Sequence, residues 1–523
     1  MYRSSEQRLA SLQSEGVRGL LKDSLKGLEK ESLRVTPRGV ISQLPHPTAL
    51  GSALTHPSIT TDYSEALLEF ITAPERRLHD MLAQLDAIHG YVYRNIGDEL
   101  LWSASMPCIA GPDSDIPIAE YGESNTGRMK HVYRRGLAWR YGRRMQAIAG
   151  IHFNYSFSQA FINVLRQADR SPLDEQAFRS AAYFGLIRNI QRYGWLIPVL
   201  FGASPALCKS FLGGAPDTFQ RFDAHTLYEP WATSLRMSDV GYKNKAQAAL
   251  AVSYNDLDSY VASLVAAMRT TDPDYARIGT CVDGEWRQLS ASILQIENEY
   301  YSFVRPKAVA QPGERPTAAL KRAGVEYVEI RALDLDPFTP AGVGRDALCF
   351  IETLLLFCLL QDSPPIDAHE LRHINHNQGL VARDGRNPQR LLRQGDGREV
   401  LLRNWALTLI DAMQGPATLL DELREGTPYA EALRNCRARI EDPDRTPSAR
   451  VLQSMREHGE NFIQFGLRVS QAHRAHFLAA RLDPAVDARF QSLAADSLLQ
   501  QAEIEAAEQE PFETHLARYL DQL

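Results

Sequence analysis

Polar side chains alternate with apolar ones in two short segments, 151–157 and 325–331, and a third segment, 27–35, places two glutamates two residues apart. Residues two apart in a β-strand face the same side of a sheet, so each segment predicts a strand with one polar and one apolar face. The polar faces carry Glu29 and Glu31, then His152, Asn154 and Ser156, and then Tyr327, Glu329 and Arg331. Most of these side chains could hold a metal ion or contact a phosphate.

Carboxylates gathered with one histidine indicate a site for a hard divalent cation such as Mg²⁺, which prefers oxygen ligands and binds substrate phosphates. Without a cation, such a cluster would repel itself. Arg331, two residues from Glu329, could contact a transferring phosphoryl group through two N–H groups at once. The alternative is a polar face that simply meets water, although solvated faces usually favour Lys, Thr and mixed charges.

The segment 60–70 adds Asp62, Glu65 and Glu69. Glu65 and Glu69 share a face in either a strand or a helix, so periodicity does not decide between these structures. Asp62 precedes the apolar run, where it could be a helix cap or a metal ligand.

The chain contains neither G-x-x-x-x-G-K-[ST] nor G-x-G-x-x-G. ATP, if it binds, is therefore held without a Walker loop or a Rossmann turn. An antiparallel sheet lined with metal ions is another way to hold a triphosphate. The formal net charge of −7 argues against a general nucleic-acid binder, because such proteins are usually basic.

A different metal motif, H-E-x-x-H, occurs at His369–His373. The extended zinc-protease form requires Gly three residues after the second His, where this chain has His376. Short patterns recur by chance in a long chain, so we expect this match to be a decoy.

The elements that position the polar residues can be read from the same periodicities. The β-type patterns lie at 28–35, 66–72, 150–157, 289–296 and 325–333, and helical patterns include 78–95 and 177–192. This irregular mixture predicts an α+β fold with an antiparallel sheet and surrounding helices, not regular βαβ units. From about residue 345 the patterns are mainly helical. We expect a catalytic domain at 1–345 and a helical C-terminal region packed on it at 346–523, with a soft boundary because no Pro/Gly/Ser-rich linker separates them.

The composition, 44% hydrophobic over 523 residues, predicts a globular protein with a large core. The N-terminus has no signal-like apolar region, and the longest apolar stretch, 347–360, is too short to span a bilayer. We therefore expect a cytoplasmic protein without a membrane partner, either a monomer or a weak homo-oligomer. The six cysteines form no C-x-x-C pair, so we expect reduced and mostly buried thiols.

Longer stretches around these residues resemble the glutamate–cysteine ligases of the proteobacterial type. The matching stretches are KGLEKESLRV (26–35), HPTALGSALTHPSITTDYSEALLEFIT (46–72), SMPC (105–108), YGESNTGRMKHVYRRGL (121–137), IAGIHFNYSF (148–157), LFGASPA (200–206), SLRMSDVGYKNK (234–245), LQIENEYYSFVRPK (294–307) and GVEYVEIRALDLDPF (324–338). Their fixed order over roughly residues 20–350 is a stronger signal than any single motif.

The resemblance implies a glutamine synthetase-like antiparallel sheet that curves over ATP and its metals. It also implies that ATP drives ligation of the glutamate γ-carboxylate to the amine of cysteine through γ-glutamyl phosphate, the first step of glutathione biosynthesis. Mg²⁺ is the implied cofactor, with Mn²⁺ as a substitute, and ATP, glutamate and cysteine are the implied substrates.

The resemblance also implies roles for individual residues. The metal ligands would be Glu29, Glu31, Asp62, Glu69, His152 and Glu329. Arg331 would stabilise the transferred phosphoryl group, while Arg236 and the backbone from Ile148 to Gly150 would hold glutamate. The cysteine pocket would be lined by Tyr63, Tyr133, Leu137, Tyr242 and Tyr301. Taken alone, Arg236 also suits a structural ion pair, and the last two tyrosines suit core aromatics.

The chain departs from the family pattern at a few positions. Lys30 and Ser32 stand where the family often has Arg and Thr, and both neighbouring carboxylates are intact. Tyr63 stands where the family often has Phe, which adds a hydroxyl near the thiol pocket. Two alternatives stay open: a related ligase that joins glutamate to another amine, and a non-catalytic nucleotide or amino-acid sensor on the same fold.

Overall fold

The computed structural model describes residues 8–10, 12, 15–108, 111–214, 218–241 and 250–522. A seven-stranded antiparallel sheet lies at its centre, with strand order β11-β12-β5-β1-β3-β2 and β4 paired to β1. The strands are β1 (Leu25–Val35), β2 (Ile59–Thr61), β3 (Leu67–Ile71), β4 (Leu100–Leu101), β5 (Ile151–Ser156), β11 (Val304–Lys307) and β12 (Tyr327–Leu333). The α+β class and the antiparallel sheet are thus confirmed.

Four of the five predicted strands form within a few residues of their expected positions. In β5 and β12, alternation of apolar and polar residues explains why, since residues two apart in a strand face the same side. The fifth, at 289–296, is wrong: in the structure these residues form bends and coil, with one isolated β-bridge between Ser292 and Thr271. Leu289 and Ile296 pack with residues of helix α4, whereas Leu294 belongs to the main core.

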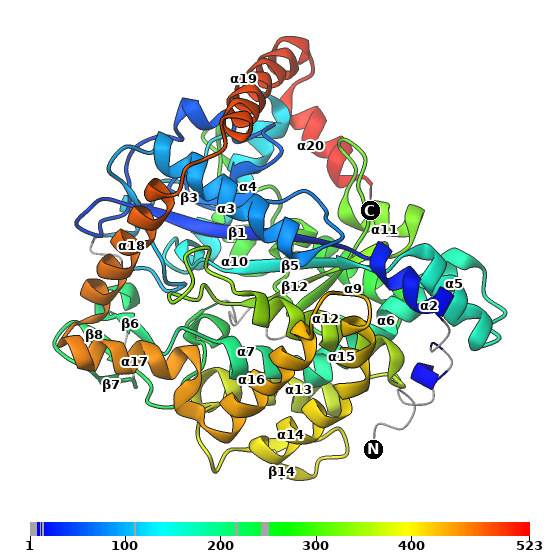
Figure 1. The fold of residues 1–523 in the computed structure, drawn as a ribbon. Helices are drawn as coiled ribbons and strands as arrows, with labels where there is room; N and C mark the ends of the chain where they lie inside the picture. The colour runs from blue at the N-terminus through cyan, green and yellow to red at the C-terminus, as the bar shows by residue number, and fades with distance from the viewer. Residues whose placement is uncertain are drawn as a thin grey trace.

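Helices surround the sheet, and strands β1, β5 and β12 cross the middle of Figure 1. On the N-terminal side these helices are α2 (Glu15–Gly19), α3 (Leu78–Asn95), α4 (Asn125–Tyr141), α5 (Gln159–Ala168), α6 (Glu175–Tyr193), α7 (Leu196–Phe201), α9 (Leu257–Arg269), α10 (Pro273–Ile278) and α11 (Pro316–Ala323). Helix α3 buries Leu78, Met81, Leu85 and Ile88, whose spacing of three to four residues gives one apolar stripe.

The C-terminal third is mainly helical, as predicted. Its helices are α12 (Arg345–Leu360), α13 (Ala368–Asp384), α14 (Leu402–Ala412), α15 (Gln414–Asp421), α16 (Pro428–Glu441), α17 (Pro447–His458), α18 (Phe462–Ala479), α19 (Pro484–Ala507) and α20 (Phe512–Leu520). In Figure 1, α13, α14 and α16 gather at the bottom, whereas α19 and α20 stand at the top. A hairpin of β13 (Leu391–Arg393) and β14 (Glu399–Leu401) interrupts the helices. One hydrophobic core contains residues from both sides of position 345.

Helix α12 is buried on all sides, which explains its apolar sequence. The described part of the chain contains no helix with the length and apolar character needed to cross a bilayer. The one carboxylate of α12's buried stretch, Glu352, is fully buried and contacts Lys26 Nζ at 3.0 Å. The hydroxyls of Tyr155 and Tyr429 donate to it at 3.0 and 2.7 Å. This polar cluster joins β1 and β5 to α16, and breaking a buried pair of this kind costs about 3–5 kcal/mol.

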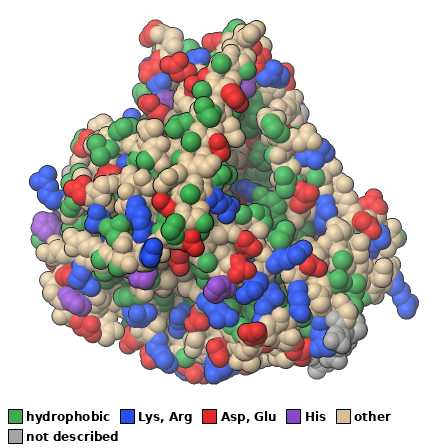
Figure 2. Space-filling view, turned by 45° about the horizontal axis from the view of Figure 1, so that its top comes forward, with side chains coloured by type: hydrophobic (Ala, Val, Ile, Leu, Met, Phe, Trp, Pro, Cys, Tyr) green, Lys and Arg blue, Asp and Glu red, His purple; other side chains and the backbone are tan. Residues whose placement is uncertain are grey.

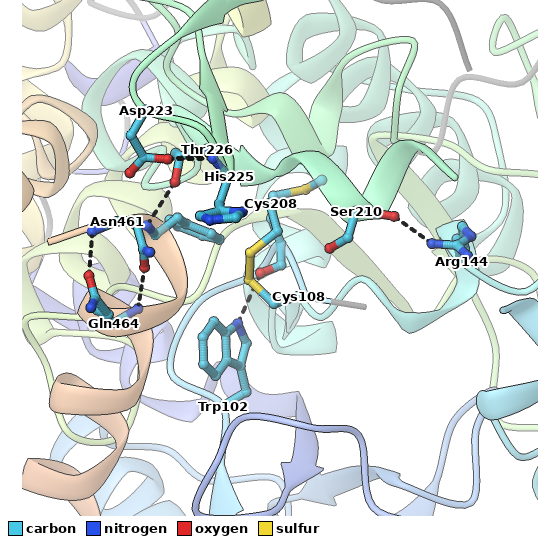
Figure 3. The surroundings of a disulfide bond; sticks show 12 residues. Trp102, Cys108, Arg144, Cys208, Ser210, Asp223, His225, Thr226, Asn461 and Gln464 are labelled. Atoms are coloured by element: carbon cyan, nitrogen blue, oxygen red, sulfur yellow. Dashed lines mark hydrogen bonds between the residues drawn. A yellow bond between two sulfur atoms is a disulfide. The ribbon is translucent and has the colours of Figure 1, made fainter. Parts of the chain in front are cut away.

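Cys108 and Cys208 form a disulfide, with Cα atoms 5.3 Å apart (Figure 3). Cys208 ends strand β6 (Ala206–Cys208), which pairs with β8 (Thr226–Tyr228), and β8 pairs with β7 (Gln220–Arg221). The prediction of reduced thiols is therefore wrong for these two residues. One hundred residues separate them, so only the folded chain brings them together. Cys281 is exposed, while Cys349, Cys358 and Cys436 are buried free thiols, as expected.

We predict that this disulfide contributes to stability. Closing a loop of about 100 residues restricts the unfolded chain by up to about 4–5 kcal/mol. Reduction, or the double change Cys108→Ser and Cys208→Ser, should lower the free energy of unfolding measured in guanidinium chloride. Cys281→Ser is the matched control and should leave it unchanged. Identical unfolding curves with and without reductant would contradict the prediction.

Candidate active site

The polar faces of four adjacent strands meet on one side of the sheet. The strand register places Glu29 opposite His152, Glu31 opposite Glu69, and Glu329 opposite Asn154. Residues opposite one another on antiparallel strands have neighbouring side chains. The expected polar face is therefore confirmed as a single cluster assembled from segments far apart in the sequence.

At the centre of the cluster, His152 Nδ1 lies 3.1 Å from Glu29 Oε2 and 3.6 Å from Glu329 Oε1. His152 Nε2 lies 3.8 Å from Glu31 Oε1, and Asn154 Nδ2 donates to Glu29 Oε1 at 2.7 Å. Ligand atoms of Glu29, His152 and Glu329 all lie within 4.8 Å of one another, a separation at which one ion could contact all three.

Two oxygens in this group bear on whether a cation could bind, because neither has a hydrogen-bond partner in the described part of the chain. Glu329 Oε2 and Asn154 Oδ1 are buried and have no hydrogen-bond partner among the described residues. A buried polar atom without a partner is costly, and a cation bound there would offset that cost. Oxygen donors with one imidazole are the ligands that a hard divalent cation accepts. The residues present therefore fit Mg²⁺ or Mn²⁺.

Glu31, Asp62 and Glu69 extend the acidic cluster along β1, β2 and β3. Burial, together with the nearby charge of Asp62, raises the pKa of Glu31 to about 8. Burial also raises the pKa of Glu69 well above its usual value, and the charges of Glu29, Asp62 and Glu31 act in the same direction. A bound cation relieves this repulsion, because it favours the ionised carboxylates.

Basic residues face the cluster from β11 and β12. Arg331 Nη1 lies 3.1 Å from Glu329 Oε1, and Lys307 Nζ lies 3.6 Å from the same oxygen. Burial alone raises the pKa of Glu329, but Lys307 and Arg331 overcome this effect and hold the pKa well below its usual value. Arg331 Nε has no partner among the described residues and so remains able to donate. Arg331 also lies at a register irregularity between Ile330 and Leu333, and such bulges redirect side chains.

These residues line a cavity of about 410 Å³. The end of the molecule that carries α19 and α20 is hollowed between raised ridges in Figure 2. Besides the charged cluster, aromatic and apolar residues line the cavity, among them Tyr63, Tyr133, Leu137 and Tyr301. It therefore has a charged end over the sheet and an aromatic end against α4.

The remaining predicted site residues lie beside the cavity or outside the described residues. Arg236 is buried, and its Nη2 donates to the Arg331 carbonyl at 3.0 Å. The N–H of Gly150 donates to Glu31 Oε2 at 2.5 Å, and Ile148 is buried just before it. Arg236, Ile148 and Gly150 thus lie behind the cavity wall. Tyr242 lies outside the described residues.

The structure decides between strand and helix, and between cap and cavity residue, for the acids of segment 60–70. Asp62 follows β2 and lines the cavity, so it does not cap a helix. Glu69 lies in strand β3 and also lines the cavity. Glu65 lies outside it, where its carboxylate accepts from the His46 and Glu120 N–H groups at 2.7 and 2.9 Å.

The H-E-x-x-H match is explained without a metal. It lies on α13, where the rings of His369 and His373 contact each other at 4.2 Å between centroids. In the zinc-protease motif, Glu370 would be the general base. Here it instead pairs with Arg192 Nε at 2.6 Å. The groups of described residues that could hold a metal ion do not include this segment.

Several cavity residues were missed from the sequence. They include Lys130 and Arg134 on α4, Arg305 and Lys307 on β11, and Tyr141, Met145, Asn298 and Glu299. Arg305 and Lys307 are two apart, so alternation could have found them. Pro306 between them disfavours a strand, since proline cannot donate to the ladder. The i, i+4 spacing of Lys130 and Arg134 indicates one helix face but not what that face meets.

Comparison with known proteins points to one family. A family profile described as glutamate-cysteine ligase matches residues 9–381. A glutamate–cysteine ligase of Alcanivorax borkumensis is 51% identical over 522 residues, covering 98% of this chain and 99% of that protein. One of Pseudomonas paraeruginosa is 50% identical and covers 98% of this chain and 97% of that protein.

Solved structures agree. The crystal structure of a glutamate–cysteine ligase from Francisella tularensis in complex with AMP superposes with a TM-score of 0.90 at 38% identity. The match covers 95% of this chain and 97% of that chain. A bifunctional glutathione synthetase from Pasteurella multocida shares the fold at a TM-score of 0.66 and 24% identity, covering 88% of this chain and 53% of that chain.

The cluster predicts cation binding. Mg²⁺ or Mn²⁺ at one hundred times its Kd should stabilise the folded protein by about 2.7 kcal/mol, seen as a rise in thermal midpoint. Glu329→Gln should weaken cation affinity by about tenfold to 100-fold, since even changes in residues that only orient ligands cost that much. Glu65→Gln, outside the cavity, is the matched control. A response to Zn²⁺ alone, or an unaltered Mg²⁺ response in Glu329→Gln, would mean that the site is misassigned.

Proposed function

This chain belongs to the glutamate–cysteine ligase family, and we propose that the cavity over the polar sheet face is where its substrates meet. The chain catalyses the ATP-dependent joining of glutamate to cysteine, the first step of glutathione synthesis. One observation supports placing the reaction here: a single cavity brings together the carboxylate cluster, Arg331 and an aromatic end.

We assign the charged end to the phosphates and their cations. Glu29, His152 and Glu329 would hold one cation, and Glu31, Asp62 and Glu69 would complete the ligand set. Mg²⁺, when bound, neutralises charge on the phosphate oxygens and makes the terminal phosphorus more electrophilic. The unpartnered Glu329 Oε2 supports this assignment, because this buried oxygen has no hydrogen-bond partner among the described residues.

A second cavity, of about 290 Å³, would receive the adenosine. Asn298, Arg305 and Lys307 line both cavities, so the second continues from the charged end of the first. Its other walls include Tyr260 and Leu320, which suit a flat aromatic base. The AMP complex of the Francisella tularensis relative supports nucleotide binding on this fold.

The chemistry follows from these positions. The γ-carboxylate of glutamate attacks the γ-phosphorus of ATP in line, and ADP leaves as γ-glutamyl phosphate forms. Arg331 would stabilise charge on the transferring group, for which its unpartnered Nε and its Nη groups are suited. The cysteine amine then attacks the acyl carbon, and phosphate leaves with the loss of a proton from the amine. Buried Arg236, beside Gly150, would hold glutamate during both steps.

The aromatic end would receive cysteine. Tyr63, Tyr133, Leu137 and Tyr301 present carbon-rich surfaces, which suit a small thiol side chain better than a charged one. Burial raises the pKa of the Tyr63 hydroxyl, so it stays protonated. Tyr242 remains a predicted member of this pocket.

We further propose that the protein works in the cytoplasm as a monomer or weak homo-oligomer. Disulfides are rare in reducing compartments. Cys108 and Cys208 are each only 6% exposed, and this burial would protect their bridge. The division into a catalytic domain at 1–345 and a C-terminal region at 346–523 also stays a proposal.

An assay of ADP release tests the function directly. Glutamate is supplied with cysteine, with other small amines, or alone, and the product is identified by mass. We expect γ-glutamylcysteine, loss of turnover on chelation, and recovery with Mg²⁺ or Mn²⁺. Faster turnover with another amine would indicate a related ligase, and absence of ATP turnover would indicate a sensor.

Arg331→Ala should separate chemistry from binding. Loss of one contact made mainly in the transition state lowers kcat by about 10²-fold to 10³-fold, with a smaller effect on the KM for ATP. Arg331→Lys should recover only part of the rate, because an ammonium group cannot make a two-pronged contact. Arg236→Ala is the matched comparison and should mainly raise the KM for glutamate. If Arg331→Ala instead raised a KM while kcat stayed unchanged, Arg331 would only position substrate.

A further inference from the structure

The last helix of the chain, α20, packs behind one wall of the active-site cavity. It stands beside α19 at the top of Figure 1 and contacts α4. It also lies beyond residues 9–381, the part matched by the family profile. No chemistry considered so far has required it.

One small hydrophobic cluster connects α20 to the cavity. Its buried members are Val132, Leu289, Ile296, Phe512 and Leu516, with Met129, Tyr133, Trp286, Tyr519 and Leu520 packed against them. Met129, Tyr133, Leu289 and Ile296 also line the active-site cavity. The same side chains therefore border the substrate space and pack in the cluster that α20 completes.

Phe512 is the central contact. It is 2% exposed and meets the Trp286 ring edge to face, with centroids 5.1 Å apart. The Arg128 guanidinium of α4 lies 4.7 Å above the Phe512 ring. Phe512 thus joins α4 to the segment 286–296, the two parts of the chain that supply this wall. Within the wall, Gln295 Nε2 donates to the Tyr133 carbonyl at 3.3 Å.

Both ends of α20 are anchored near the site. Before it, Glu508 Oε1 accepts from Asn125 Nδ2 at 2.8 Å, and Glu508 Oε2 from the Asn125 N–H at 3.1 Å, at the start of α4. After it, Gln522 Oε1 accepts from the Arg315 N–H at 2.9 Å. Arg315 is buried and pairs with Glu297 at 2.9 Å, next to the wall residue Ile296.

We propose that α20, through Phe512, is a positioning element for the acceptor amino acid. This inference rests on the proposed assignment of the aromatic end to cysteine. Protein cores are close-packed, so a side chain that loses its backing shifts or relaxes. Without Phe512, Tyr133 and Ile296 lose support on the side away from the substrate, while the charged end over the sheet keeps its own contacts.

The experiment compares Phe512→Ala, Phe512→Leu and Phe490→Ala with the unaltered protein. Phe490 is the matched control, because it is a buried phenylalanine of α19 that stacks on Tyr91, away from the cavity. We expect Phe512→Ala to raise the KM for cysteine about tenfold, since small misplacements are costly in active sites. The KM values for ATP and glutamate should change less than about twofold, and Phe512→Leu should recover part of the loss.

The thermal midpoints show whether lost stability explains the result. Phe490→Ala should lower the midpoint without raising the KM for cysteine. The proposal is overturned if Phe512→Ala leaves that KM unchanged, or raises all three KM values together. If Phe512→Ala does not fold, Phe512→Leu is judged by the same criteria. Tyr133→Ala tests the underlying assignment: an unchanged cysteine KM there would refute the acceptor pocket itself.

Discussion

The concentration of carboxylates on one buried face of a β-sheet is the constraint on which the rest of this molecule depends. Glu29, Glu31, Glu69 and Glu329 are fixed by strand register, so they cannot move apart to relieve their repulsion. Positive charge must offset this repulsion: Lys307 and Arg331 supply part of it, and the proposed metal ions would supply the rest. The fold therefore holds the carboxylates in place before any cation binds, which is the meaning of preorganisation.

Contacts on the opposite face of β1 help to fix its register. Lys26 and Lys30 alternate with the acids and point away from the cavity, where both are buried. Lys26 meets Glu352 of α12, whereas Lys30 donates to Ser32 Oγ at 2.8 Å and lies 2.8 Å from His89 Nε2. Burial lowers the pKa of Lys30 to about 7. The strand is thus tied on both faces by polar contacts, so a slip by one residue would bury unpaired charges.

Local pattern predicted much of the sheet, because β5 and β12 alternate between apolar and polar residues, and the two glutamates of β1 lie two residues apart. It failed where long-range packing decides. Residues 289–296 look like a strand but pack partly against α4, and Cys108 meets Cys208 only after the chain has folded. The roles proposed for Arg236 and Tyr133 came from resemblance, since their spacing alone indicates no partner. Periodicity could not predict the contribution proposed for α20, because a helix that only packs behind a cavity wall needs no pattern of catalytic or ligand-binding residues.

Pro306 has a consequence beyond the site. Strand β11 lies at the edge of the sheet, and the carbonyls of Phe303 and Lys307 accept from the N–H groups of Arg331 and Glu326, so these residues face inward. The backbone groups of Pro306 point the other way, out of the sheet edge, and proline has no N–H to donate there. A strand from another chain would meet a gap in the ladder there. Strand β11 thus places the positively charged side chains of Arg305 and Lys307 in the cavity, and its proline protects the edge of the sheet against aggregation.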